Sequence, residues 1–177
     1  MLEPDDALGH MLLAKWDYVE GIIARHGFLD DYVMGDWIER FYHQAPDKWR
    51  LELSTDLTYI SDGREAVVMA EGRVLHRGRP RIPVGFVTEE LLYPGRAPRW
   101  DFWPDEEGLS LVLAESRRTP TGTTIPIAGR GEPGGELHVV LPSGHLDYLQ
   151  LGDDISRITE LREKPSLPSA FDVPSGR

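Results

Sequence analysis

Short alternating runs separated by turn residues fill the stretch from Trp37 to Leu75, which constrains the fold more than any other feature. It reads WIERFYHQAPDKWRLELSTDLTYISDGREAVVMAEGRVL. From Lys48 to Leu53, apolar and charged residues alternate, as in a strand with one buried face. Asp62-Gly63 separates two further runs, and Asp-Gly in that position is the strongest short-range hairpin signal. The pattern predicts an antiparallel meander.

Further strands follow the same reasoning along most of the chain. Runs of apolar or β-branched residues bounded by Gly, Pro, Asn, Asp or Ser predict strands. The predicted strands are Asp36–His43, Lys48–Leu53, Leu57–Ser61, Glu65–Glu71, Arg73–His76, Arg99–Trp103, Leu109–Glu115, Thr124–Ala128, Glu136–Leu141, His145–Leu151 and Ile155–Arg162.

Two helices are predicted beside these strands. An apolar stripe at steps of three and four residues predicts a long helix from about Asp6 to His26, with Gly27 as the left-handed residue after its end. A short helix, Val87–Tyr93, is ended by Pro94-Gly95. One sheet face must meet the helices, so the class is α+β. We expect a curved antiparallel sheet, an incomplete β-barrel, packed on one long N-terminal helix and one short helix.

Length and composition limit the other possibilities. The chain has 177 residues, which predicts a single domain over 1–177 with an extended surface tail from about 164 to 177. Its net charge of −11 repels phosphate backbones and argues against nucleic-acid binding. It has no cysteine and no apolar run of the ~20 residues that span a bilayer. The acidic N-terminus predicts a cytoplasmic protein as written, or an envelope or secreted one if a leader was trimmed.

The histidines do not predict a metal site. If Pro142-Ser143-Gly144 is a three-residue hairpin loop, His145 shares a face with Asp147 while His138 points the other way. Two ligands on opposite faces cannot hold one ion. His145 and Asp147 could form an oriented base, but no nucleophile signature accompanies them. We therefore expect no catalytic residue, no metal and no cofactor.

Large aromatic residues on the predicted strands are the better functional signal. On a curved sheet such rings can line an apolar cavity for a lipid-like ligand, or they can form an ordinary core. A second signal is a local basic cluster at the end of the meander, because arginine matches phosphate and carboxylate oxygens. The candidate cavity residues are Trp37, Phe41, Trp49, Tyr59, Trp100 and Phe102, and the candidate anion-binding residues are Arg77, Arg79 and Arg81.

The chain resembles the LolA-like fold of lipoprotein carriers and lipoprotein-sorting-type domains. The run ERF, PDKWRLEL and LTYISDGREAVVM carries the resemblance, together with TEELLYPG, ELHVVLPSGHLDYLQL and ISRITELRE. It implies a curved, incomplete antiparallel barrel with a helical lid over a hydrophobic cavity, in proteins that carry or sense acyl chains or lipoproteins. The chain departs from the family in having no lipobox cysteine and a lid reduced to one short helix. Arg40 and Arg50 are both candidates for the family's strand arginine.

Three functions remain open on the sequence. The first is a non-enzymatic binding protein whose half-barrel holds a hydrophobic or acyl ligand. The second is a protein-interaction or regulatory module with a filled core, steered to a basic partner by its acidic charge or self-associating as a homodimer through a sheet edge. The third is a small hydrolase-like enzyme. We expect a binding protein rather than an enzyme.

Overall fold

The computed structural model describes residues 4–28, 34–82, 86–96, 109–129, 134–163 and 168–174. The chain forms two compact units. Two strands, β1 (Tyr18–Phe28) and β12 (Asp154–Arg162), contribute one end to each unit. The prediction of a single domain stays a prediction. Unit 1 comprises Met1–Lys15, His26–Met34 and Val87–Ile158, and unit 2 comprises Trp16–Arg25, Gly35–Phe86 and Thr159–Arg177.

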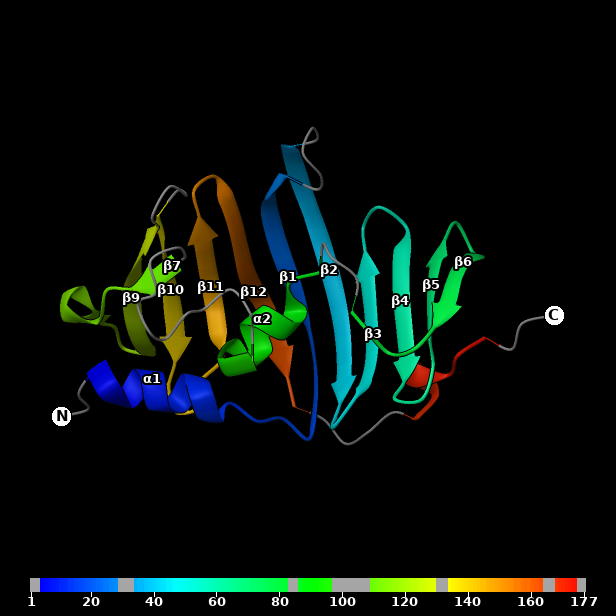
Figure 1. Ribbon diagram of the computed structural model, residues 1–177, viewed down its shortest axis with the longest axis horizontal. Coiled ribbons are helices and arrows are strands. Elements are labelled where there is room, and N and C mark those ends of the chain that lie inside the picture. The colour runs from blue at the N-terminus through cyan, green and yellow to red at the C-terminus, as the bar shows by residue number, and fades with distance from the viewer. Residues whose placement is uncertain are drawn as a thin grey trace. The chain divides into compact units, whose positions relative to one another are not determined.

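Unit 2 contains the predicted meander. Its strands lie in the order β6-β5-β4-β3-β2-β1, with the end of β12 beside β1 (Figure 1). The pairs from β2 to β6 are antiparallel, so the prediction of a meander is confirmed. The strands are β2 (Met34–Gln44), β3 (Lys48–Leu53), β4 (Leu57–Asp62), β5 (Ala66–Ala70) and β6 (Arg73–Gly78).

One face of this sheet forms the core of unit 2. Phe41 on β2 pairs with Leu51 on β3, which pairs with Tyr59 on β4. In the next row His43 pairs with Trp49. Cross-strand partners share a face, and all five of these residues are buried. We call this side of the sheet the aromatic face.

The other face of the sheet is partly covered by the C-terminal segment. A 3₁₀-helix, η3 (Pro168–Phe171), contacts β3 and β4. Phe171 is 2% exposed and meets the Tyr18 ring edge-on at 6.5 Å. Within the predicted surface tail, this segment therefore forms a 3₁₀-helix and buries the Phe171 ring.

Unit 1 combines the helices with the remaining strands. Its strand order is the ends of β1 and β12, then β11, β10, β9 and β7, with β8 on β9. Helix α1 contacts β9 and α2 contacts β11, over one face of the strands (Figure 1). The elements are α1 (Pro4–Leu13), α2 (Thr88–Leu92), η1 (Pro94–Arg96), β7 (Leu109–Leu111), η2 (Leu113–Glu115), β8 (Arg117–Arg118), β9 (Gly122–Gly129), β10 (Gly135–Val140) and β11 (Leu146–Leu151).

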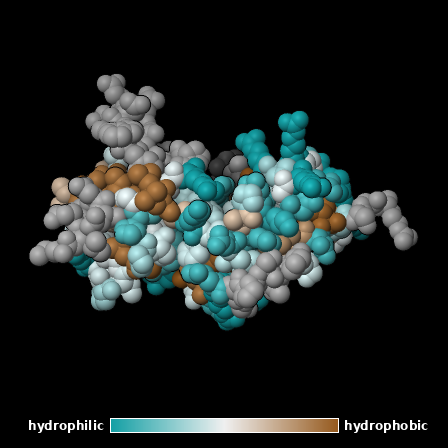
Figure 2. Space-filling model, turned by 90° about the horizontal axis from the view of Figure 1, so that it is seen from below, coloured by the Kyte–Doolittle hydropathy of each residue, from teal (hydrophilic) through white to brown (hydrophobic). Residues whose placement is uncertain are grey.

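The core of unit 1 lies between these helices and the sheet. Met11 of α1 and Leu91 of α2 are buried, as are Ile125 and Leu137, which face each other on β9 and β10. Leu12 and Leu13 at the end of α1 are 52% and 79% exposed. Seen from below, hydrophobic side chains gather on the part of the surface where α1 lies (Figure 2).

The first helix is shorter than the sequence predicts. Helix α1 ends at Leu13, and the second half of the predicted helix is strand β1. Val19, Ile22 and Ile23 are β-branched, and such side chains lose rotamer freedom in a helix but fit a pleated sheet. Gly27 has the expected positive φ, but it lies inside β1 rather than after a helix.

The predicted α+β class is confirmed. Antiparallel strands and two helices make up the described parts, and in neither unit does the described strand order close on itself. The predicted strand Leu109–Glu115 is correct only in its first part, since Val112 ends the pairing and a 3₁₀-turn follows. The predicted strand Arg99–Trp103 lies outside the described residues.

We expect two glycines of unit 1 to respond oppositely to substitution by alanine. Gly144 has φ +76°, and a Cβ there would lie 1.9 Å from the His10 carbonyl oxygen, so Gly144→Ala should lower stability by more than about 1 kcal/mol. Gly9 lies inside α1 with no atom within 4 Å of such a Cβ, so Gly9→Ala should raise stability by about 1 kcal/mol. Urea unfolding of both variants measures the difference, and equal shifts would contradict it.

Candidate functional site

The structure brings four of the six candidate cavity residues together on the aromatic face of unit 2. Trp37 and Phe41 lie on the same face of β2, Trp49 lies on β3 and Tyr59 lies on β4. Their exposed fractions are 6%, 0%, 7% and 1%. Trp100 and Phe102 lie outside the described residues.

Protein side chains fill the space around these rings. The Trp49 ring stacks on His43 with centroids 3.8 Å apart, and the Tyr59 ring lies 6.5 Å from Phe86. His43 Nδ1 is held 3.0 Å from the Lys48 carbonyl oxygen. A Cβ on Gly21 of β1 would lie 2.6 Å from Phe41 Cζ, so the phenylalanine ring occupies the space that a side chain would take. The described part of this face is packed as a core.

Two polar groups on β2 are buried on the same face. Glu39 is fully buried, and its carboxylate lies 3.8 Å from the guanidinium of Arg25, whose side chain is 13% exposed. The indole Nε1 of Trp37 is buried and has no hydrogen-bond partner among the described residues. The sequence analysis did not single out either feature, although alternation along β2 places Glu39 on the face of Trp37 and Phe41. Arg40, one candidate for the family's strand arginine, is exposed, and Arg50 pairs with Glu52 at 2.6 Å.

A shallow hollow of about 180 Å³ lies on unit 2 over β1, β2 and β12. Its lining contains both acidic and basic side chains, and Glu160 accepts a hydrogen bond from Arg162 at 2.9 Å. Beside it, burial and then the neighbouring Glu20 raise the pKa of the Tyr18 hydroxyl to about 12. Such a polar lining does not suit an acyl chain. The lining residues are Glu20, Gly21, Ile22, Arg40, Phe41, Tyr42, Glu160 and Arg162.

The candidate anion-binding arginines lie at the outer edge of the meander. Arg77, on β6, donates to Glu65 Oε2 at 2.9 Å and to the carbonyl oxygen of Pro174. Arg79 and Arg81 follow β6 and are exposed. Anion binding by this cluster stays a prediction.

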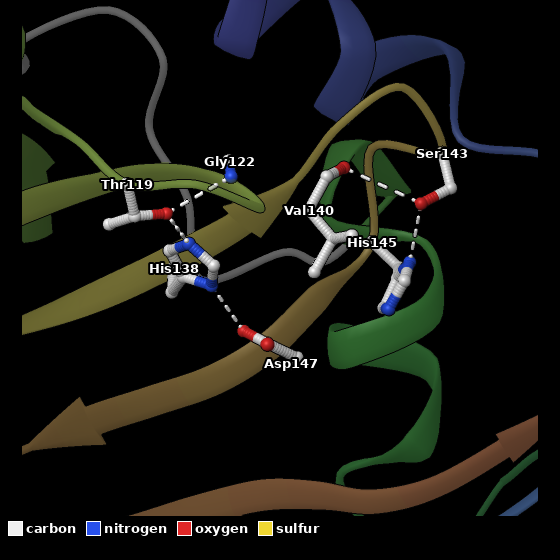
Figure 3. A network of polar contacts seen from close by, with 7 residues as sticks. All are labelled: Thr119, Gly122, His138, Val140, Ser143, His145 and Asp147. Atoms are coloured by element: carbon white, nitrogen blue, oxygen red, sulfur yellow. Dashed lines mark hydrogen bonds and ion pairs between the residues drawn. The ribbon is translucent and has the colours of Figure 1, made fainter.

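Unit 1 contains a polar network on β8–β11 (Figure 3). His138 donates from Nδ1 to Asp147 Oδ1 at 2.5 Å, and its Nε2 lies 2.8 Å from Thr119 Oγ1. The Thr119 oxygen also accepts the Gly122 N–H at 3.0 Å. His138 is only 9% exposed. The prediction that His138 points away from Asp147 is wrong, because a register shift after His138 pairs Val139 with Leu146 and brings Asp147 to His138.

The hydroxyl of Thr119, the imidazole of His138 and the carboxylate of Asp147 are connected in the same order as the nucleophile, base and orienting acid of a catalytic triad. Here the hydroxyl oxygen is held in the tight turn from Thr119 to Gly122, whose backbone also closes through the Thr119 N–H and the Gly122 carbonyl. The network therefore ties that turn to β10 and β11.

His145 is a second, more deeply buried histidine in the same unit. Its Nδ1 lies 2.8 Å from Ser143 Oγ, and the residue is 6% exposed. Burial lowers its pKa from 6.5 to about 4, with nearby His138 acting in the same direction and Asp147 opposing. At neutral pH the ring is uncharged.

Neither metal ligation nor membrane spanning is supported by the described residues. In that part of the chain, no group of three or more His, Asp or Glu side chains is placed to hold a metal ion. None of the described helices has the length and hydropathy to cross a bilayer.

No protein-family model and no curated protein matches the sequence. The fold is similar to that of the LolA superfamily protein NE2245 from Nitrosomonas europaea, at 8% identity and a TM-score of 0.42, over 98% of this chain and 99% of that one. It is also similar to MucB, at 17% identity and a TM-score of 0.46 over 97% of this chain. A third similarity is to the Pseudomonas aeruginosa MucA/MucB complex, at 17% identity and a TM-score of 0.43 over 96% of this chain.

The chain spans 63% of the first MucB chain and 61% of the second. At these identities the likeness is one of fold, and no function follows from it. NE2245, a LolA superfamily protein, and MucB are thus similar in fold to a chain whose sequence resembles the LolA-like fold.

Proposed function

We propose that this protein is a non-enzymatic binding protein whose ligand is another protein, contacted at the surface. The observation that carries the proposal is the filled aromatic face of unit 2. Trp49 and Tyr59 lie against other rings at the distances of a packed core, and these two residues and Phe41 are at most 7% exposed. A binding protein with a filled core must present its ligand site on its surface.

The shallow hollow supports the same proposal. Both of its arginines, Arg40 and Arg162, are exposed, and so is Glu160. An acyl chain gains free energy only by leaving water for an apolar surface, at about 25 cal/mol per Å². Exposed charges in the lining remove that gain, whereas they are ordinary at the polar rim of a protein–protein interface.

Native mass spectrometry of the protein purified from its own host tests the proposal. We expect a stoichiometric complex with a polypeptide, and no adduct of acyl-chain mass. A fluorescent fatty acid titrated into the purified protein should show no saturable binding. An acyl-sized mass that is lost on denaturation, together with saturable fatty-acid binding, would contradict the proposal.

One observation favours a second candidate, a binding protein for an apolar ligand with a polar head. Within the part of the chain that the structure describes, the buried Trp37 Nε1 has no hydrogen-bond partner, and such orphaned donors are rare in native proteins. A ligand oxygen could accept this N–H. If so, saturable fatty-acid binding by the native protein should weaken in Trp37→Phe, which keeps an aromatic ring and removes the donor. Equal binding by the two proteins would remove the candidate.

A further inference from the structure

Strand β6 is the outermost strand of unit 2 and has β5 as its neighbour on one side among the described strands (Figure 1). All its residues from Arg73 to Arg77 are exposed. Two of them are apolar, with Val74 45% and Leu75 64% exposed. An outer strand of this kind presents a row of N–H and C=O groups with which another extended chain can pair.

Strand β6 and the segment that follows it are positively charged. Arg73 on β6 and the following Arg79 and Arg81 are exposed and form no ion pair with other described residues. Arg77 carries a fourth positive charge there, which Glu65 partly balances. Since the whole chain has a net charge of −11, the chain without these four arginines has −11 − 4 = −15. The edge is thus a local basic region on a strongly acidic protein.

We propose that β6 binds an extended acidic segment of a partner protein, which adds to the sheet as a further strand. The proposal rests on the proposed function and names its surface and the chemistry of the partner. Backbone hydrogen bonds to β6 would provide the register, as in other cases of strand addition. Carboxylates on the segment would pair with Arg73 and Arg79, and apolar residues between them would cover Val74 and Leu75.

Charge favours such a partner over a second copy of this chain. Two copies would each bring a net charge of −11 and would place one basic edge against the other, which is repulsive. The pairing of β5 with β6 also shifts register, so that Val68 pairs with His76 and Met69 with Val74, leaving Leu75 as an extra residue. Bulges of this kind protect edges from indiscriminate pairing. A complementary charge would then select the segment that does bind.

Fluorescence anisotropy with three labelled peptides of about eight residues, enough to span β6 at about 3.3 Å per residue, tests the proposal. The first alternates Glu and Val, the second alternates Lys and Val, and the third is the Glu–Val peptide with alternate backbone nitrogens methylated. We expect saturable binding of the first, weaker at high salt, and no saturable binding of the other two. The methylated peptide separates strand pairing from simple charge attraction.

Variants locate the binding site. The double variant Arg73→Glu/Arg79→Glu should weaken binding of the Glu–Val peptide by at least about tenfold. Arg118→Glu is the matched control, because Arg118 is an exposed arginine of a short strand in unit 1, and it should change binding by less than about twofold. Circular dichroism should show both variants folded, since the changed side chains are exposed.

Several results would overturn the inference. These are no binding of the Glu–Val peptide, equal binding of the methylated peptide, or equal weakening by Arg118→Glu. Dimers in analytical ultracentrifugation that Arg73→Glu/Arg79→Glu abolishes would assign the edge to a second copy instead. Failure of this inference can be distinguished from failure of the proposed function. If the native protein forms a complex with a polypeptide but chemical cross-links from that polypeptide avoid β6, only the inference about β6 is contradicted. A bound acyl chain defeats the proposed function and leaves the peptide result standing.

Discussion

Replacing Trp49 with alanine should lower the free energy of unfolding by about 3–5 kcal/mol. The ring is 7% exposed and stacks on His43, so its removal leaves a cavity that the flanking strands cannot readily close. A tryptophan lining an open, ligand-sized cavity would lose little packing on truncation. Chemical denaturation of the apo-protein therefore distinguishes a filled core from an open site, and a loss below about 1 kcal/mol would contradict the filled core.

A matched control and a second variant sharpen this test. Leu75→Ala removes an apolar side chain of β6 that is 64% exposed, and it should change stability by no more than about 0.5 kcal/mol. Combining Trp49→Ala with His43→Ala in a double-mutant cycle should give a coupling energy of about 0.5–1.5 kcal/mol for the stacked pair. A coupling near zero would mean that the two rings do not support each other in solution.

Local chemistry explains why the meander could be predicted from the sequence. In the turn between β4 and β5, Asp62 Oδ1 accepts the backbone N–H groups of Arg64 at 2.7 Å and Glu65 at 2.9 Å, and Gly63 takes φ +90°. These hydrogen bonds lower the pKa of the Asp62 carboxyl. The turn is thus specified by adjacent residues. The alternation in Lys48–Leu53 is equally local, and its bounds are confirmed.

The errors arise where distant contacts decide the outcome. The segment after Leu13 has apolar residues at steps that fit a helix. Val19, Gly21 and Ile23 also lie two residues apart, as residues on one face of a strand do. In the folded protein the Phe41 ring of β2 fills the space over Gly21. No local pattern reports that contact. The same holds for Phe171, which the sequence places in a surface tail and which is buried.

The sequence indicated which residue types lie at the candidate site, but it left open what these residues do. The aromatic residues Phe41, Trp49 and Tyr59 share a face through the register of β2, β3 and β4, which the sequence left open. Whether the space between them is empty depends on side chains from other strands and from the loop at Phe86. The partner of His138 was missed because one extra residue in a hairpin exchanges the faces of every later side chain. A bulge of this kind leaves no sequence signal beyond the turn itself.

His145 should make the stability of the protein depend on pH between about 6.5 and 4. Its pKa in the folded protein is about 4, because burial disfavours the charged ring, and the ordinary value of 6.5 applies when the chain is unfolded. Above pH 6.5 both states hold a neutral ring, so stability is full. As the pH falls, the unfolded chain binds a proton that the folded protein does not, and about 3 kcal/mol is lost by pH 4. Below pH 4 both states are protonated and the loss stops growing.

The variant His145→Gln isolates this contribution, since glutamine keeps a polar side chain near Ser143 and cannot titrate. The difference in unfolding free energy between native protein and variant should fall by about 3 kcal/mol from pH 7 to pH 4, while the carboxylates that titrate in the same range contribute equally to both. The ring Cε1–H resonance in NMR provides an independent reading and should titrate near pH 4. A midpoint near 6.5 would show that the ring is hydrated, and it would remove the buried histidine as a cause of acid sensitivity.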